Sequence, residues 1–187
     1  MLLVSVGRLE ANKGFDVLIR VLATLANRNV MPARWKWVLV GDGSMRHTLH
    51  RAVEAAGLSA RVVLQGRASV DDLHGWYEAA TLFVHPTLYE GSSLVTLEAM
   101  AHRRPVVASR AGGLPDKVIP GVTGWLVPPG NEEALGGAII KALSDPARLQ
   151  SMGSAGRALV DKEFSWRAAT DRLLDVYREL LARRNPL

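Results

Sequence analysis

The sequence contains no cysteine among its 187 residues. Disulfide bonds and thiolate metal sites are therefore excluded, and the composition fits a reducing compartment, so we expect a cytoplasmic protein. No apolar run approaches the roughly 18 residues of a membrane span. The first ten residues also lack a basic segment followed by a long apolar one, so no signal peptide is expected.

Long runs of lysine and arginine are absent as well, although the formal net charge is +5. The basic residues are scattered, apart from the pairs Arg103-Arg104 and Arg183-Arg184, and aromatic residues do not alternate with them. Nucleic acid is therefore not an expected partner, whereas a phosphorylated small molecule would suit the charge. With 48% hydrophobic and 22% charged residues, the chain can bury a sizeable core and is not expected to be disordered.

What is present is an alternation of short β-rich runs with longer helical patterns. Strands are expected at 2–6, 35–40, 61–64, 81–84, 105–109 and 124–127, and helices at 14–27, 45–57, 70–79, 93–102 and 114–119. Near-continuous apolar strands in this order are typical of a doubly wound parallel sheet, in which both faces are covered. We predict the α/β class, with one Rossmann-like domain, a parallel sheet of about six strands, helices on both faces and further helices at the C-terminus.

Three helices are expected after residue 130. Asn131, Asp145 and Ser165 are suitable N-caps, and Pro146 takes the first helical position after Asp145. The last of these helices carries an apolar stripe that should pack against another surface, with a partner domain as one option. Its members are Ala169, Leu173, Val176, Tyr177, Leu180 and Leu181.

Ligands of open α/β sheets bind beyond the carboxyl ends of the strands, where helix N-termini present free N–H groups. The first such loop, "GRLEANKG", places Arg8 and Lys13 near a helix start. Asn12 and Gly14 stand where a Walker A motif needs other residues, so that motif is excluded. The two cations either bind phosphate oxygens or form a solvated surface loop, and their spacing alone does not decide between these alternatives.

The next two loops contain weaker signals. "GDGSMR" begins like a dinucleotide fingerprint but lacks its third glycine, and Asp42 or Ser44 is expected to cap the helix that follows. In "GRASVDD", Ser69 and Asp72 have the spacing of a capping box. Both loops are therefore interpreted mainly as helix starts.

The fourth loop and its helix, "HPTLYEGSSLVTLEAM" (85–100), are the most informative part of the sequence. Ser92, Ser93 and Leu94 are expected to expose N–H groups at a helix N-terminus, which suits a phosphate. Glu90, just outside the helix, could accept hydrogen bonds from a polyol, and Glu98 could accept both hydroxyls of a vicinal diol. Cations, N–H groups and carboxylates together indicate a nucleotide sugar.

Each of these carboxylates also has an ordinary interpretation when taken alone. Glu90 could be a helix-dipole partner, and Glu98 an exposed helical side chain. His85 has no serine or aspartate at triad spacing, so we interpret it as structural. The other histidines lack metal-ligand spacing, and no metal site is expected. A glycosidase is disfavoured, because carboxylates assigned to different parts of one donor would not face each other across a scissile bond.

Four segments together resemble a known family: "GRLEANKGFDVLI", "VGDGS", "HPTLYEGSSLVTLEAMAHRRPVVAS" and "GGLPDKVIPGVTGWLVPP". They resemble the C-terminal, donor-binding domain of retaining GT-B glycosyltransferases of family 4, also called group 1. The likeness extends over nearly the whole chain, including the closing "FSW" and "YRELL" segments. Its most specific element is the E-x7-E pair formed by Glu90 and Glu98, combined with the upstream Arg8 and Lys13.

The resemblance implies roles for these residues. Arg8 and Lys13 would bind the donor diphosphate and stabilise the departing nucleotide, and Glu90 would contact hydroxyls of the transferred sugar, so these three are the expected catalytic residues. Glu98 would hold the ribose diol. Backbone groups of Ser92, Ser93, Leu94 and Val95 would meet the phosphates and the sugar, and Arg67 and Ala68 would lie beside the base. No metal or other cofactor is implied, because cations and a helix N-terminus supply the positive charge.

The sequence departs from the family pattern in three ways. Arg103 stands where the family usually has glycine, and Asp116 replaces a common glutamate. The N-terminal acceptor domain of a GT-B enzyme is absent from residues 1–187, so we interpret the chain as a truncated product or an excised domain. As partners we expect a nucleotide sugar, such as a UDP- or GDP-sugar, together with the missing acceptor domain or a second copy. A membrane surface, at the inner face, would concern only the full enzyme.

The leading hypothesis is therefore the donor-binding half of a retaining, hexosyl-type, metal-independent glycosyltransferase that transfers no sugar by itself. Two alternatives remain open. One is a non-catalytic nucleotide-sugar-binding or interaction module that pairs with a separate acceptor domain. The other is a sugar-nucleotide epimerase of GT-B architecture, against which the E-x7-E spacing and the Arg8/Lys13 loop both argue.

Overall fold

The computed structural model describes residues 1–184, and its centre is a six-stranded parallel sheet in the order β3-β2-β1-β4-β5-β6. The strands are β1 (Leu2–Val6), β2 (Lys36–Val40), β3 (Val62–Gly66), β4 (Leu82–His85), β5 (Val106–Ser109) and β6 (Gly124–Val127). All six lie within two residues of the ranges expected from the sequence. The predicted parallel α/β sheet is confirmed.

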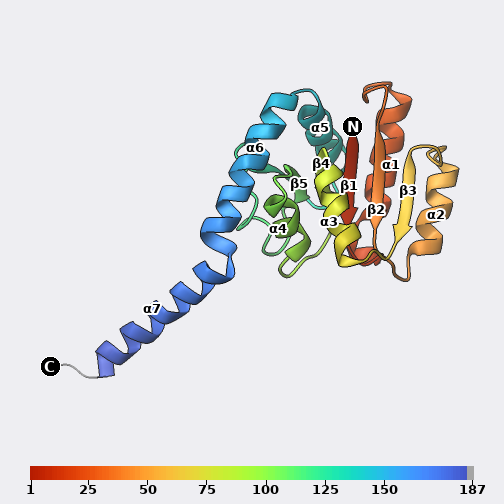
Figure 1. Cartoon of the computed structure of the whole chain (residues 1–187). Coiled ribbons are helices and arrows are strands. Elements are labelled where there is room, and N and C mark those ends of the chain that lie inside the picture. The colour runs from red at the N-terminus through yellow and green to blue at the C-terminus, as the bar shows by residue number, and fades with distance from the viewer. Residues whose placement is uncertain (185–187) are drawn as a thin grey trace.

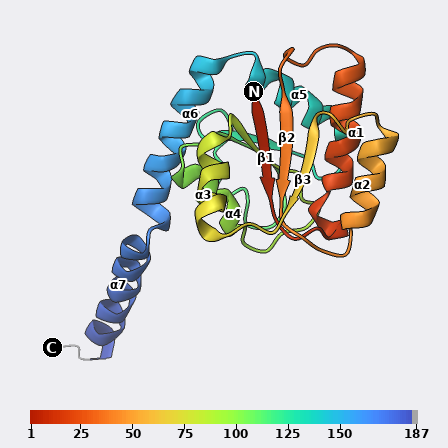
Figure 2. The same ribbon diagram turned by 45° about the vertical axis from the view of Figure 1, so that its right-hand side comes forward.

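Helices cover both faces of this sheet (Figures 1 and 2). They are α1 (Phe15–Asn27), α2 (Arg46–Ala55), α3 (Val70–Ala79), α4 (Leu94–Ala101), α5 (Glu132–Leu143), α6 (Pro146–Leu159) and α7 (Trp166–Arg184), with a 3₁₀ turn η1 (Ala11–Lys13) and a π-helical turn η2 (Val160–Phe164). One apolar core lies between the sheet and α1, α2 and α5, and a second between the sheet and α3 and α4. Alternate strand residues supply the two cores; Leu3 belongs to the first and Val4 to the second.

Most of the predicted helix starts are confirmed by their hydrogen bonds. Ser69 Oγ accepts from the N–H of Asp72 at 3.1 Å, and Asn131 Oδ1 accepts from the N–H of Ala134 at 2.8 Å. Asp145 accepts from the N–H of Arg148 in the same way, with Pro146 at the first helical position. Each of these side chains satisfies an N–H group that has no partner inside its helix.

The expected cap of α2 was wrong. Its N-cap is Met45, and no side chain caps it. Asp42 instead accepts from the N–H of Gly43 at 2.9 Å, and the Ser44 hydroxyl donates to Glu10 at 2.8 Å. Both side chains therefore fix the loop between β2 and α2, because each has a closer partner there than the helix N–H groups.

A helix at 114–119 was also expected, and this prediction was wrong. The segment forms turns, with N–H groups of Lys117 and Val118 both donating to the carbonyl of Leu114. Pro120 disfavours helical backbone at the preceding residue, and six residues are too few to offset helix nucleation. The turns nevertheless fix the side chain of Lys117, which becomes important at the candidate site.

The helix α7 projects away from the body of the molecule (Figures 1 and 2). The predicted apolar stripe lies on it, and within residues 1–184 it is uncovered: Leu173, Val176, Tyr177, Leu180 and Leu181 are all more than half exposed. The described residues therefore do not supply the surface against which this stripe was expected to pack. None of the described helices is both long and apolar enough to cross a bilayer.

Candidate functional site

The sheet order places two loops on either side of its topological switch point. β1 and β4 are neighbours at the centre, and the chain leaves them toward opposite edges of the sheet. In open parallel sheets this divergence opens a crevice at the carboxyl ends of the strands, where ligands bind. The loop after β1 carries Arg8 and Lys13, and the loop after β4 carries Glu90, Ser92 and Ser93.

Lys13 and Glu90, which are 77 positions apart, meet at this point. Lys13 Nζ donates to Glu90 Oε2 at 2.7 Å, and each side chain is only 13% exposed. His85, at the end of β4, has its Nε2 atom 3.0 Å from the same carboxylate oxygen. The predicted juxtaposition of the basic and acidic loops is present, with a histidine that the sequence interpretation had not connected to the site.

Backbone contacts hold the two loops against each other. The carbonyl of Asn12 accepts hydrogen bonds from the N–H of Leu88 at 2.8 Å and from the hydroxyl of Thr87 at 3.0 Å. Gly14 has a φ of +64°, and a β-carbon there would lie 2.3 Å from the carbonyl oxygen of Pro86. Because only glycine tolerates both this backbone conformation and this approach, Gly14 lets the Lys13 turn reach the β4 loop.

Electrostatics fix the protonation states of the cluster. Hydrogen bonds from His85 and then Lys13 lower the pKa of Glu90 to about 2, so its carboxylate is ionised at neutral pH. Burial lowers the pKa of His85, although Glu90 opposes this shift, and we therefore assign a neutral ring. Because an ionised carboxylate can only accept, the ring proton belongs on Nε2. This leaves Nδ1 as a bare acceptor, which is consistent with its lack of a partner among the described residues.

Both donors use the same oxygen of Glu90. Lys13 and His85 contact Oε2, whereas Oε1 forms no hydrogen bond with residues 1–184. Glu90 therefore combines a fixed orientation with one free acceptor oxygen. That combination suits recognition of a hydroxyl group.

The N-terminus of α4 lies beside this cluster. Ser93, its N-cap, is buried, and its hydroxyl lies 3.3 Å from His85 Nε2 and 2.9 Å from Thr96 Oγ1. Ser92 and Leu94 are exposed, and Val95 is half-buried. Lys117 Nζ donates to Ser92 Oγ at 2.7 Å and to the carbonyl of Ser93 at 3.1 Å.

Gly112 permits a close approach between the turn after β5 and the Glu90 loop. Gly112 has a φ of +50°, and a β-carbon there would lie 1.5 Å from the carbonyl oxygen of Glu90. The N–H of Gly113 donates to the carbonyl of Gly91 at 2.9 Å. The turn after β5 thus packs against the Glu90 loop and brings Lys117 to the start of α4.

Glu98 lies one helical turn farther along α4 and is exposed. The hydroxyl of the buried Tyr77, on α3, donates to Glu98 Oε2 at 2.7 Å. Burial, followed by this hydrogen bond, raises the pKa of Tyr77, so the phenol keeps its proton and remains a donor. Tyr77 therefore orients one carboxylate oxygen of Glu98.

Arg8, Arg67 and Ala68 line one cavity of about 480 Å³, which lies at the carboxyl ends of β1, β2 and β3. Its wall also includes Gly41, Gly43 and Leu73. Small-molecule pockets commonly have volumes of roughly 300–1,000 Å³. The structure thus places Arg8, Arg67 and Ala68 at this cavity, Lys13, Glu90 and Ser93 in the cluster after β1 and β4, and Glu98 beside Tyr77.

His85, Tyr77 and Lys117 were missed by the sequence interpretation. His85 could have been noticed, because it ends the strand that precedes the Glu90 loop. Tyr77 and Lys117 carry no such local signal, since each reaches the site from a different element. Among residues 1–184 no group of three or more side chains is arranged to hold a metal ion.

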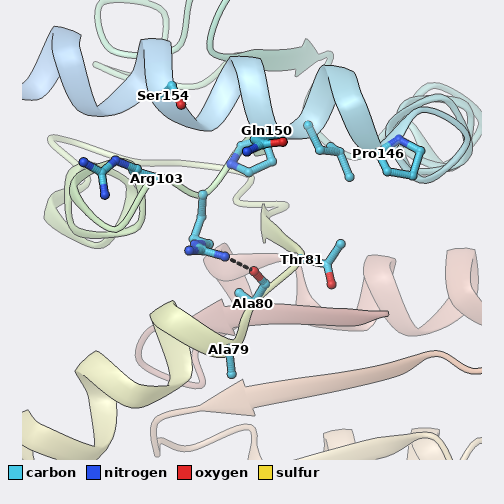
Figure 3. Close-up of a pocket in the computed structure, with 10 residues that line it drawn as sticks. Ala79, Ala80, Thr81, Arg103, Pro146, Gln150 and Ser154 are labelled. Atoms are coloured by element: carbon cyan, nitrogen blue, oxygen red, sulfur yellow. Dashed lines mark hydrogen bonds between the residues drawn. The ribbon is translucent and has the colours of Figure 1, made fainter.

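A second cavity, of about 450 Å³, lies at the amino ends of β4 and β5, between residues 79–81 and α6 (Figure 3). Arg104 lines it but donates to the carbonyls of Ala80 at 2.8 Å and His102 at 2.6 Å. Arg103, also in its wall, has a left-handed backbone with a φ of +56°, a conformation that glycine adopts without strain and other residues adopt rarely. None of the predicted site residues lines this cavity.

Comparison with known proteins identifies the family to which this chain belongs. Residues 1–159 match the family described as "Glycosyl transferases group 1". The chain belongs to this family. As a group 1 glycosyltransferase chain, it has a Rossmann-like fold that matches one half of GT-B glycosyltransferases.

Among curated relatives, this group 1 chain is 33% identical over 175 residues to the alpha-D-kanosaminyltransferase of Streptomyces kanamyceticus, covering 94% of this chain and 45% of that protein. The sucrose-phosphate synthase of Thermosynechococcus elongatus has a similar structure, with a TM-score of 0.84 and 34% identity, over 97% of this chain and 46% of that one. Anabaena HepE, solved in complex with UDP, has a TM-score of 0.84 and 26% identity, over 95% of this chain and 48% of that one. The chain therefore spans about half the length of each of these three relatives.

Proposed function

We propose that this chain is the nucleotide-sugar-binding half of a retaining, metal-independent glycosyltransferase, acting together with a separate acceptor-binding domain. The observation that carries the proposal is the 2.7 Å contact between Lys13 and Glu90 at the switch point of the sheet. It joins a cationic loop and an acidic loop at the place where this fold class binds ligands. HepE, a structural relative, is seen with UDP.

The phosphates of the donor would lie near Arg8, Lys13 and the start of α4. One N–H of the Lys13 ammonium is engaged by Glu90, which leaves two for phosphate oxygens. Backbone N–H groups at Ser92–Val95 would add neutral donors and the positive end of the helix dipole. Positive charge placed in this way stabilises a departing diphosphate without a metal.

The carboxylates would bind the hydroxyl groups of the donor. Glu90 Oε1, which is free of hydrogen bonds to the described residues, would accept from the transferred sugar, while Lys13 and His85 hold the other oxygen. Glu98, oriented by Tyr77, would accept from the ribose diol. The cavity beside Arg67 and Ala68 has room for the base.

The exposed apolar stripe of α7 indicates where a partner would contact this half of the enzyme. An uncovered row of large apolar side chains on a projecting helix is typical of a surface that another protein surface covers. We propose that the acceptor domain covers it. Size-exclusion chromatography distinguishes this arrangement from pairing of two identical chains, because a second copy would double the apparent mass of the isolated protein.

Calorimetric titration with UDP, GDP and ADP, each with and without its sugar, tests the proposed function. We expect at least one diphosphate to bind, and we expect Arg8→Ala and Lys13→Ala each to weaken it by about tenfold or more. Lys36→Ala removes the same charge at the amino end of β2 and should leave the diphosphate affinity unchanged. Binding that survives both site variants would refute the diphosphate assignment.

The reaction itself requires the acceptor domain. Product analysis of the complete two-domain protein distinguishes transfer from epimerisation, because an epimerase would return an altered nucleotide sugar with no acceptor present. The anomeric configuration of the product, read by NMR, tests retention. An inverted anomer would contradict the retaining mechanism.

A further inference from the structure

Lys117 is a buried cation at the candidate site for which neither the sequence pattern nor the family resemblance gave a role. Only 5% of the residue is exposed. Its ammonium donates to the hydroxyl of Ser92 at 2.7 Å and to the carbonyl of Ser93 at 3.1 Å. Both contacts are with the last two residues before α4.

The partners of Lys117 are unusual for a buried ammonium. Both are neutral oxygens, and within residues 1–184 no carboxylate forms an ion pair with it. Glu90 and Asp116 attract it only from longer range, and burial lowers the pKa of Lys117 below its ordinary value. A buried charge without an ion-pair partner is costly, so such groups are rare unless a ligand or another function requires them.

The position of the ammonium adds to this cost. The first turn of a helix carries a positive partial charge from its free N–H groups, and α4 begins at Leu94, directly after the two serines that Lys117 contacts. A cation at this end of a helix is repelled by the helix dipole. An anion bound at the same place would remove both penalties at once, because it would be attracted by the ammonium and by the N–H groups.

We propose that Lys117 is a positioning residue for the diphosphate of the donor: it holds the Ser92–Ser93 turn in place and concentrates positive charge at the start of α4. The inference rests on the proposed function of this site. Two of the three ammonium hydrogens are occupied by Ser92 and Ser93, so its contribution to the diphosphate comes mainly from charge and from the orientation of the turn.

Two substitutions distinguish the contribution of the Lys117 charge from that of its hydrogen bonds. Lys117→Met removes the charge and both hydrogen bonds, whereas Lys117→Gln keeps amide N–H donors for Ser92 and Ser93 but no charge. Lys36→Met is the matched control, since it removes an exposed lysine at the opposite edge of the sheet. Affinities for UDP, GDP and ADP and for the corresponding nucleosides are measured by protein-observed NMR titration, which extends to millimolar binding.

We expect both Lys117 variants to lose about tenfold in affinity for the diphosphate that the wild type binds, with less than about a twofold change for its nucleoside. A role confined to packing would weaken diphosphate and nucleoside equally. Equal losses, or a Lys117→Gln variant with wild-type diphosphate affinity, would overturn the inference. If Lys117→Met does not fold, Lys117→Gln alone decides between these outcomes.

The same titrations distinguish an error in the role of Lys117 from an error in the proposed function. A wild-type protein that binds none of the three diphosphates would refute the proposed function and the inference with it. A wild type that binds one, together with Lys117 variants that bind it equally well, would refute only the inference.

Discussion

A cavity of similar size lies at the amino edge of the sheet, where the parallel strands begin, and at the carboxyl edge, where they end. A basic side chain contacts a helix end at each edge, but the two contacts differ. At the amino edge, Arg104 donates to the carbonyls of Ala80 and His102, which are the C-cap residues of α3 and α4. At the carboxyl edge, Lys117 lies against the start of the same helix α4. A cation at a helix C-terminus satisfies free carbonyls and complements the dipole, whereas one at the N-terminus opposes it. Arg104 therefore has a structural role at two helix ends, and the contrast supports the proposal that Lys117 attracts an anion.

The largest stability effect is expected at the amino edge. Arg104→Met should lower the free energy of unfolding by roughly 2–3 kcal/mol, because two carbonyl groups lose a charged donor. Urea denaturation measures this change. Diphosphate affinity of the folded variant should stay at the wild-type value.

Arg103→Met is the matched control, since it removes the neighbouring charge from an exposed side chain. It should change stability much less than Arg104→Met. A loss of diphosphate affinity in Arg104→Met at wild-type stability would reverse the assignment of the two edges.

The next largest effect concerns Glu90 and depends on pH. The pKa of Glu90 is lowered to about 2 by His85 and Lys13, so its ionised form stabilises the native state above the ordinary carboxyl pKa, and this contribution disappears as the pH falls toward 2. Glu90→Gln should therefore cost roughly 1–2 kcal/mol at pH 7 and progressively less below about pH 5. Urea denaturation of both proteins between pH 7 and pH 3.5 measures the difference. A difference that stays constant over this range would contradict an ionised Glu90 held by two donors.

A smaller effect is expected where α3 meets α4. Tyr77→Phe removes the hydrogen bond to Glu98 and should lower the free energy of unfolding by about 1 kcal/mol, because the exposed carboxylate can turn to water instead. Thermal denaturation measures the change. Tyr89→Phe, on an exposed side chain, provides the control and should have no measurable effect. Equal melting temperatures for all three proteins would show that Tyr77 does not hold Glu98.

The smallest effect is a gain at the amino edge. Arg103 adopts a φ of +56°, so Arg103→Gly should relieve backbone strain of about 1 kcal/mol, partly offset by the greater entropy of glycine in the unfolded chain. The expected net gain is about 0.5 kcal/mol. Arg103→Ala keeps the β-carbon and should give no such gain. A gain of the same size in both variants would assign the effect to charge instead of backbone conformation.

Local patterns in the sequence predicted much of the fold. Apolar runs gave all six strands to within two residues, and short polar side chains marked the starts of α3, α5 and α6. They failed at Asp42 and Ser44, whose side chains found closer partners in the loop, and at 114–119, where Pro120 and the short length favoured turns. Propensity and capping act over a few residues, so a sequence exposes them directly.

The sequence by itself determined which residue types follow each strand, and therefore that cations, carboxylates and helix N–H groups would gather at one edge of a parallel sheet. Only the tertiary structure decided that Lys13 and His85 share one oxygen of Glu90, that Tyr77 orients Glu98, and that a turn after β5 delivers Lys117 to the start of α4. These contacts join elements up to 77 positions apart. Their distances depend on sheet order and on the approaches permitted at Gly14 and Gly112, which no local pattern encodes.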